Sequence, residues 1–485
     1  MSIRTRFAPS PTGYMHIGNL RTALWAYLIA KKDPEGVFIL RIEDTDQGRL
    51  VEGATDIIYD TMRECGLKHD EGPDVGGPVG PYVQSERVRS GLYMEYAKKL
   101  IRLGGAHYCF CDEKTIEQAK AAKDVTDGNR SYDDPCRLLD PKEAERRAES
   151  GEPFVIRQTI PSEGTTSFDD EVFGTITVDN STLDEQVLIK SDGFPTYNFA
   201  NVIDDHLMGI TDVVRGMEYL SSTPKYNLIY DAFGWDKPRY IHCPPVMKDE
   251  HSKLSKRNGD ASFQDLMKKG YLPEAVLNYI AMLGWSPENN QEIFTLDELV
   301  KAFNVKHIGQ NGAIFDPVKL TSINGLWLRG MDPESYFQLV EPYIREAVKK
   351  DYDLRKIASG VQQRANTLVE IPPMLDFYDT FPAYSNDLYF NKKMKTNPEI
   401  SLVSLKECLT ALLNLNDWSF DALHETLMAL PAKMGIKNGQ VLFPLRVAIS
   451  GKQSTPGGAI EIAEILGKEE TLRRLKSSIQ QLENQ

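Results

Sequence analysis

The amino-acid sequence predicts an α/β domain that is interrupted by an α+β insertion and followed by an all-α C-terminal region. Short strands and amphipathic helices alternate in the N-terminal part, which is typical of a parallel sheet with crossover helices. The pattern changes near residue 106, and almost no strand pattern is found beyond about residue 325. Because 485 residues exceed the size at which one hydrophobic core keeps growing, we expect several domains.

The N-terminal part shows the alternation most clearly. We expect strands over residues 5–8 and 37–42, and helices over 19–32, 52–65 and 85–103. In the first of these helices, Leu20, Leu24, Tyr27 and Leu28 fall on one face at helical spacing. After the insertion the α/β pattern resumes over 196–202 and 212–215, with a helix near 223–233 and a strand over 239–243.

The insertion and the C-terminal half have their own patterns. Within residues 106–190 we expect a polar helix over 113–123 and short strands over 154–158, 175–178 and 186–190. Residues 385–400 have the composition of a linker between two helical bundles. The predicted domains are therefore 1–105 together with 191–245, then 106–190, 246–325, 326–390 and 391–485.

Composition argues against several classes of protein. No apolar run approaches the roughly 20 residues of a membrane-spanning helix, and the N-terminus lacks the apolar stretch of a secretory signal. Six cysteines are too few for a disulfide framework, so we expect reduced thiols or a metal in a cytoplasmic protein. The net charge of −14 argues against coating of nucleic acid by bulk attraction, although it is compatible with local basic grooves.

Residues 9–19 (PSPTGYMHIGN) join the first predicted strand to the first predicted helix through a tight turn. The free N–H groups and the positive end of such a helix form an anion site. Gly13 allows the backbone to turn, and Gly18 allows a ligand to approach the helix closely. His16 can donate a hydrogen bond to a phosphate oxygen. The alternative is a proline-rich turn with a surface histidine.

Residues 253–257 (KLSKR) place three cations in a polar loop of five residues. The ammonium groups of Lys253 and Lys256 could neutralise charge that develops on a leaving pyrophosphate. A solvated run of charges would have the same pattern. Together with the His16 loop, the segment predicts two sides of one ATP site.

Two further groups of charged residues are expected at the carboxyl ends of strands, where open α/β sheets bind ligands. The acidic cluster over 43–46 includes Glu43, which could bind an ammonium group or a metal, or belong to a segment that caps the next helix. Arg6 and Arg215 also lie at strand edges, where each could bind a carboxylate or form a structural salt bridge.

A group of cysteines has the spacing of a metal site. Cys109 and Cys111 are followed by Tyr132 and Cys136, and three thiolates with one further ligand would suit tetrahedral Zn²⁺. Tyrosine is an unusual zinc ligand, and Leu138 stands where an imidazole would complete a Cys-x-His pair. The alternative is that the three cysteines are buried thiols without a metal.

These motifs resemble those of class I aminoacyl-tRNA synthetases. The His16 loop resembles their HIGH segment, with Asn19 in place of the last histidine, and residues 253–257 resemble their KMSKS loop. The chain resembles bacterial glutamyl-tRNA synthetases over its whole length, in segments 6–13, 41–46, 192–197, 213–218, 444–451 and 456–457. The resemblance implies a Rossmann-type catalytic domain and a helical anticodon-binding region.

The resemblance also implies roles for individual residues. Glutamate would be bound by Arg6, Ser10, Glu43, Tyr197, Asn201 and Arg215, with Glu43 taking the α-ammonium group. ATP would be bound by Ser10, His16, Gly18, Glu218, Lys253 and Lys256, of which His16, Lys253 and Lys256 would act in catalysis. Zinc, where present, would be held by Cys109, Cys111, Tyr132 and Cys136.

The implied reaction has two steps. The glutamate α-carboxylate attacks the α-phosphorus of ATP to give glutamyl-adenylate and pyrophosphate, and the terminal ribose hydroxyl of tRNA(Glu) then attacks the acyl carbon. Mg²⁺ would bridge phosphate oxygens, and bound tRNA would be required for the first step. Residues 106–190 would bind the acceptor end, 246–325 the stem and 326–485 the anticodon loop, in a monomer. Whether tRNA(Gln) is also charged is left open.

Three related functions agree less well with the sequence. A glutaminyl-tRNA synthetase would have a β-barrel anticodon domain, whereas residues 326–485 are predicted to be helical. The enzyme that adds glutamate to a tRNA base lacks an anticodon domain. A non-catalytic relative would not be expected to keep His16, Glu43, Arg215, Lys253 and Lys256.

Overall fold

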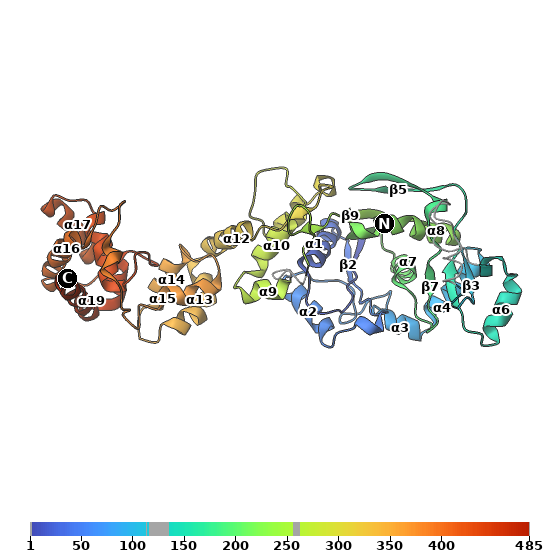
Figure 1. The fold of residues 1–485 in the computed structure, drawn as a ribbon, viewed down its shortest axis with the longest axis horizontal. Helices are drawn as coiled ribbons and strands as arrows, with labels where there is room; N and C mark the ends of the chain where they lie inside the picture. Colours follow the sequence, from blue (N-terminus) through green and yellow to red (C-terminus); the bar gives the residue numbers. More distant parts are fainter. Residues whose placement is uncertain (1, 113, 116–134, 256–261, 485) are drawn as a thin grey trace. The chain divides into compact units, whose positions relative to one another are not determined.

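The computed structural model describes residues 2–112, 114–115, 135–255 and 262–484 (Figure 1). The chain forms two compact units. The first comprises Met1–Leu266 and Pro273–Asp316, and the second comprises Met267–Leu272 and Pro317–Gln485. The helix predicted over 113–123 lies almost wholly outside the described residues.

A parallel sheet forms the centre of the first unit, with strands β1 (Arg4–Phe7), β2 (Val37–Leu40), β8 (Asp212–Gly216) and β9 (Arg239–Cys243). β1 pairs with β2, and β8 pairs with β9, both in parallel. Thr211, just before β8, donates its N–H to the Arg4 carbonyl at 2.9 Å, which places β1 beside β8. Most side chains of these strands are buried, as expected for a parallel sheet that is covered on both faces.

Helices pack on this sheet or on one another, as the alternating pattern predicted. They include α1 (Ile17–Lys32), α2 (Ala54–Glu64), α7 (Tyr197–Leu207), α8 (Thr223–Phe233), α10 (Pro273–Ala281) and α11 (Leu296–Ala302). α1 packs against β1, β8 and α10. Leu20, Leu24 and Leu28 are fully buried on α1, which confirms the predicted face, whereas Tyr27 is partly exposed. The segment over 196–202 forms the first turns of α7.

The prediction of a single helix over 85–103 is wrong. The structure has two helices there, α3 (Gln84–Arg89) and α4 (Leu92–Arg102). Gly91 lies between them with a φ of 79°, in the left-handed region that ends a helix. The apolar spacing continues through Gly91, so periodicity alone did not reveal the break.

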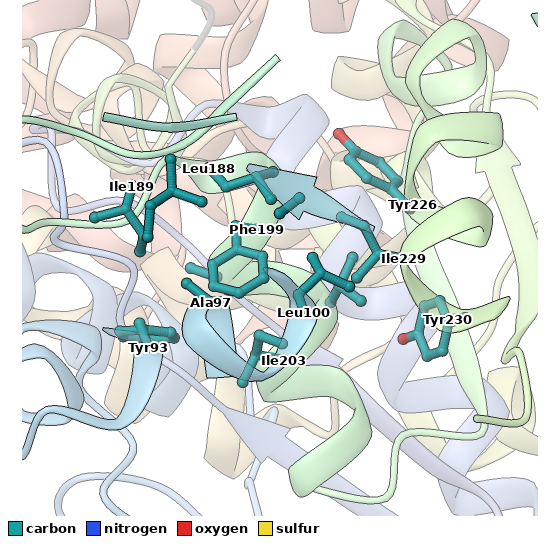
Figure 2. Packing of buried hydrophobic residues seen from close by; sticks show 14 of the residues in the cluster. Tyr93, Ala97, Leu100, Leu188, Ile189, Phe199, Ile203, Tyr226, Ile229 and Tyr230 are labelled. Carbon is teal, nitrogen blue, oxygen red and sulfur yellow. The ribbon is translucent and has the colours of Figure 1, made fainter. Parts of the chain in front are cut away.

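Part of the insertion forms a small antiparallel sheet. Its strands are β3 (Ala106–Cys109), β4 (Val155–Gln158) and β7 (Val187–Ile189), in the order β3-β4-β7, with α6 (Pro141–Glu149) packed beside β3. Figure 2 shows the hydrophobic core in which Leu188 and Ile189 of this sheet pack with side chains of α4, α7 and α8. The insertion therefore shares a core with these three helices.

A second part of the region 106–190 extends the parallel sheet itself. The hairpin of β5 (Thr165–Asp170) and β6 (Gly174–Asp179) joins it through a parallel contact between Asp170 and Tyr240, in the order β6-β5-β9-β8. β5 was not expected from the sequence. Its buried positions are Thr166, Phe168 and Asp170, so two polar residues conceal the alternation that would predict a strand.

The second unit is helical, which confirms the predicted all-α region. Its helices are α12 (Pro317–Gly330), α13 (Pro333–Ala347), α14 (Leu354–Gln362), α15 (Ile371–Leu375), α16 (Pro398–Leu413), α17 (Phe420–Met434), α18 (Gly439–Ser450) and α19 (Ala459–Glu483). α9 (Phe263–Lys268) crosses the boundary between the units. No strand occurs within residues 317–484, and one isolated bridge joins Asn391 to Thr396 inside the predicted linker. None of the described helices combines the length and apolar character needed to cross a bilayer.

Candidate active site

A cavity of about 200 Å³ lies beyond the carboxyl ends of β1, β2 and β8, where an open α/β sheet binds its ligands. Of the residues that the sequence predicted for glutamate or ATP, it is lined by Arg6, Ser10, Glu43, Tyr197, Arg215 and Glu218. A second cavity of about 410 Å³ extends to Lys190 after β7 and shares with the first Ser10, Glu43, Tyr197 and Tyr219. The structure thus brings together residues that are up to 212 positions apart in the chain.

Arg6 forms a buried ion pair and also lines the cavity. Its Nε and Nη2 donate to the two oxygens of Asp205 on α7, at 3.0 and 3.2 Å, and its Nη1 donates to the Val214 carbonyl at 3.1 Å. The salt bridge considered from the sequence is therefore present. An arginine has five N–H donors, so two remain for a ligand.

Arg215 differs, because no carboxylate of the described residues lies within salt-bridge distance of it. Its Nη2 donates to Thr223 Oγ1 at 2.7 Å, and its Nε donates to the imidazole of His242 at 3.1 Å. The guanidinium lies over the Tyr226 ring, 4.8 Å from its centroid. Arg215 is therefore a buried cation at the cavity wall whose partners are neutral.

Glu43 is the acidic group of the cavity. Its Oε1 accepts from Arg41 Nη2 at 3.0 Å and from Arg41 Nε at 3.3 Å. Burial raises the pKa of Glu43 to about 7, although Arg41 and then Arg6 act to lower it. A carboxylate and an unpaired guanidinium therefore line the same small cavity.

Tyr197 begins α7 and brings a phenol to the cavity. Its ring packs on that of Tyr219 with centroids 4.9 Å apart, and burial raises its pKa well above the usual value, so the hydroxyl stays protonated. Asn201, one turn later, is buried and is not among the residues that line the cavity. Its Nδ2 donates to the Tyr197 carbonyl at 2.8 Å.

His16 caps α1. Its Nδ1 accepts from the Gly18 N–H at 3.0 Å, and its Nε2 lies 3.2 Å from the Leu254 carbonyl, which can only accept. The proton is therefore on Nε2. Gly13 has a φ of 108°, as expected for the turn. A Cβ on Gly18 would lie 3.1 Å from His16 Nδ1, so the missing side chain makes room for the His16 ring.

The KLSKR segment begins beside this histidine. The short strand β10 (Val246–Met247) pairs in parallel with β11 (Ala313–Ile314), Met247 forms a bridge with Lys253, and Leu254 donates its N–H to the Val246 carbonyl at 3.0 Å. The exposed Lys253 and the contact of Leu254 with His16 lie at the N-terminus of α1. Lys256 lies outside the described residues.

The three cysteines predicted as metal ligands converge. The sulfur atoms of Cys109, Cys111 and Cys136 all lie within 4.8 Å of one another, and those of Cys111 and Cys136 are 3.6 Å apart. Tyr132, the fourth residue of the predicted set, lies outside the described residues. Among the residues that the structure describes, these cysteines are the only group of three or more histidines, cysteines or carboxylates arranged to hold a metal ion.

Several residues of the cavity were not predicted from the sequence. They are Phe7, Ala8, Pro9, Thr12, Asn19, Thr22, Val214, Gly216 and Tyr219. Most adjoin a predicted residue in the chain, and Tyr219 follows Glu218 directly. Thr22 lies one turn after Gly18 on α1, so its helical spacing was the available signal.

Comparisons with known proteins identify the family. The family model of class I tRNA synthetases for glutamate and glutamine, catalytic domain, matches residues 2–322, and a model of an anticodon binding domain matches residues 335–479. The glutamate–tRNA ligase of Clostridium tetani is 59% identical over 483 residues, which cover 100% of this chain and 98% of the relative. The chain belongs to the glutamate–tRNA ligase family of class I aminoacyl-tRNA synthetases.

Other relatives lead to the same family. The glutamate–tRNA ligase of Clostridium acetobutylicum is 57% identical over 482 residues, covering 99% of each chain. Among solved structures, a glutamate tRNA ligase from Elizabethkingia meningosepticum, in complex with its amino acid, is similar with a TM-score of 0.87 and 34% identity. The match covers 99% of this chain and all of that one. The class I synthetase fold expected from the sequence is thereby confirmed.

The two contacts of His16 can be separated by mutation. We expect His16→Ala to lower the free energy of unfolding of the first unit by about 1 kcal/mol, because the cap of α1 is lost. His16→Asn should lower it by less than half as much, since its side-chain oxygen can accept from the first turn. Urea unfolding followed by circular dichroism measures both. Equal losses would contradict the capping role.

Proposed function

We propose that this chain ligates glutamate to tRNA, through glutamyl-adenylate formed from glutamate and ATP, and releases AMP and pyrophosphate. The observation that carries the proposal is Arg215, a buried guanidinium that lines a cavity without a carboxylate partner among the described residues. Glu43 offers the opposite charge in the same cavity. A ligand with one carboxylate for Arg215, a second carboxylate for Arg6 and an ammonium group for Glu43 is an acidic amino acid.

In the proposed complex the amino acid is bound by Arg6, Ser10, Glu43, Tyr197, Asn201 and Arg215. Two N–H groups of Arg6 and three of Arg215 are not used by the protein contacts described above, and guanidinium forks match carboxylate geometry. Asn201 would act indirectly, since it holds the backbone of Tyr197. The neutral hydroxyls of Ser10 and Tyr197 would donate to the substrate.

ATP would be bound where α1 begins, by Ser10, His16, Gly18, Glu218, Lys253 and Lys256. The His16 Nε2 proton, which is donated to the Leu254 carbonyl here, would be donated to a phosphate oxygen, while Lys253 and Lys256 would offset charge on the leaving pyrophosphate. Mg²⁺ would be carried by the triphosphate oxygens. No general base is needed, because the α-carboxylate is already a nucleophile, so positioning and charge stabilisation supply the rate.

The tRNA partner would be tRNA(Glu), bound along the predicted regions 106–190, 246–325, 326–390 and 391–485. A cavity of about 470 Å³ in the second unit supports a base-binding role, because Arg364 and Arg446 line it. Nε of Arg446 is buried and has no hydrogen-bond partner there. A flipped anticodon base would offer it an acceptor. The sequence leaves charging of tRNA(Gln) open, and action as a monomer stays a prediction.

Pyrophosphate exchange tests the proposed function. With glutamate, ATP and tRNA(Glu) we expect exchange that is lost when tRNA is omitted. Arg215→Ala should raise the KM for glutamate about 100-fold and that for ATP less than threefold, because only one carboxylate contact is removed. Arg63→Ala, an exposed control arginine on α2, should change neither. A larger rise in the KM for ATP would place the amino-acid pocket elsewhere.

The ionisation of Glu43 predicts a pH dependence. Because its pKa is raised to about 7, the carboxylate is present above pH 7 and becomes neutral as the pH falls through 7. We expect kcat/KM for glutamate to fall about tenfold per pH unit below 7 and to be level above it. In Glu43→Gln, kcat/KM for glutamate should be low at every pH and should not fall further below pH 7. A fall below pH 7 that persists in Glu43→Gln would show that another group is responsible for it.

We propose that Cys109, Cys111 and Cys136 hold a structural Zn²⁺. Tetrahedral zinc with thiolates at about 2.3 Å separates its sulfur ligands by about 3.8 Å, close to the 3.6 Å between Cys111 and Cys136. Metal analysis should give one zinc per chain, reduced to near zero in Cys136→Ser. The control Cys408→Ala, a buried cysteine of α16, should keep the metal. Wild-type protein that is free of zinc would contradict the proposal.

A further inference from the structure

Behind the cavity, Arg215 is held by a chain of buried, hydrogen-bonded polar groups. Its Nε donates to His242 Nε2 at 3.1 Å, and Nδ1 of the same imidazole lies 2.6 Å from Asp170 Oδ2. Neither His242 nor Asp170 exposes any of its side chain to solvent. Asp170 is at the end of β5, His242 is on β9 and Arg215 is on β8, so the chain crosses three adjacent strands of one sheet.

The proton positions in this chain of hydrogen bonds, from Arg215 through His242 to Asp170, follow from the chemistry of the donors. A guanidinium N–H can only donate, so Nε2 of His242 must be the unprotonated acceptor. The imidazole proton is therefore on Nδ1, where it is donated to Asp170, and the ring is neutral. Burial lowers the pKa of His242, Asp170 acts to raise it and Arg215 to lower it again, which agrees with a neutral ring.

Thr223 also contacts Arg215, and it does not donate a hydrogen bond to the imidazole. Its hydroxyl donates to the Tyr219 carbonyl at 2.9 Å, so its oxygen is the acceptor for Arg215 Nη2 at 2.7 Å. The single proton of the hydroxyl is thus used elsewhere, although Thr223 Oγ1 lies 3.2 Å from His242 Nε2. Nε and Nη2 of Arg215 are bound on this side, which leaves the two N–H groups of Nη1 and one of Nη2 for the cavity.

Asp170 cannot rotate away from the imidazole. Its Oδ1 accepts the N–H groups of Val172 and Phe173, both at 2.9 Å, and its Oδ2 also accepts the backbone N–H of His242 at 3.2 Å. The carboxylate is therefore oriented by the turn that follows β5. Its fixed position determines the tautomer and the plane of the imidazole.

We propose that Asp170 and His242 are positioning residues, which hold the Arg215 guanidinium in the orientation that binds the side-chain carboxylate of the amino-acid substrate. The inference rests on the proposed function, since it explains how the same pocket recognises an acidic side chain. Neither residue lines the cavity, so each acts only through Arg215. A role in packing alone would depend on the size of the imidazole and not on the acceptor at Nε2.

Two amide replacements of His242 separate these roles. His242→Gln places an amide oxygen near the position of Nε2, where it can still accept from Arg215. His242→Asn places its amide near the position of Nδ1, which keeps the contact with Asp170 and removes the acceptor for Arg215. The KM for glutamate, the KM for ATP and kcat are measured by pyrophosphate exchange with tRNA(Glu), and thermal melting checks the fold.

We expect His242→Asn to raise the KM for glutamate at least tenfold, with less than a twofold change in the KM for ATP, because a hydrogen bond to a charged group is lost. The rise in His242→Gln should be at least threefold smaller. The ratio of kcat/KM for glutamate to that for glutamine should fall in His242→Asn. Equal rises in the two variants, an equal rise in the KM for ATP, or no rise would overturn the proposal.

Asp170→Asn gives an independent test that leaves His242 in place. The asparagine can direct its Nδ2 at His242 Nδ1, so the imidazole takes the other tautomer and presents an N–H to Arg215. We expect a rise in the KM for glutamate similar to that of His242→Asn, and an unchanged KM would overturn the proposal even where His242 variants fail to fold. Failure of the wild-type chain to exchange pyrophosphate with glutamate would instead contradict the proposed function, so the two failures are distinct.

Discussion

The pairing of buried carboxylates on α7 with arginines from three other segments is the constraint on which the active site depends. Asp205 accepts from Arg6 and from Arg41 Nη1, the latter at 2.8 Å, and Asp204 accepts from Arg87 at 3.0 Å. All of these side chains are buried, so each charge needs its partner. β1, β2 and α7 can therefore pack only in the arrangement that joins these charges.

The same pairing sets the chemistry of the cavity. Arg41 is held by Asp205 and in turn donates to Glu43, so the carboxylate that faces the ligand is oriented by a buried cation rather than by solvent. Arg6 keeps two donors for a ligand after its contacts with Asp205 and Val214. Arg215 lies in the same cavity with neutral partners only, and its charge is left for the substrate. Arg6 and Arg215 were both expected at strand edges, yet they differ in their partners. Arg6 forms an ion pair with a buried carboxylate, whereas Arg215 is bound by neutral groups.

The elements that were predicted well carry their information locally. Leu20, Leu24 and Leu28 on α1, the turn at Gly13, and α8, whose bounds agree with the predicted helix, depend on spacing and on backbone preferences within a few residues. The elements that were missed depend on partners outside their own segment. β5 is a strand because it pairs along its length with β6 and, at Asp170, with Tyr240 of β9, and nothing within its own six residues predicts that.

The sequence by itself determined the family, the alternation of strands and helices, and the charged residues that line the cavity, because the loops that follow parallel strands must meet at one edge of the sheet. Only the tertiary structure decided how each side chain is used. It showed that Gly18 makes room for the His16 ring, that Asn201 supports the backbone of Tyr197, and that Arg6, unlike Arg215, has a buried carboxylate partner. The physical reason is that hydrogen-bond partners and burial are properties of residues brought together from distant segments, which no local pattern encodes.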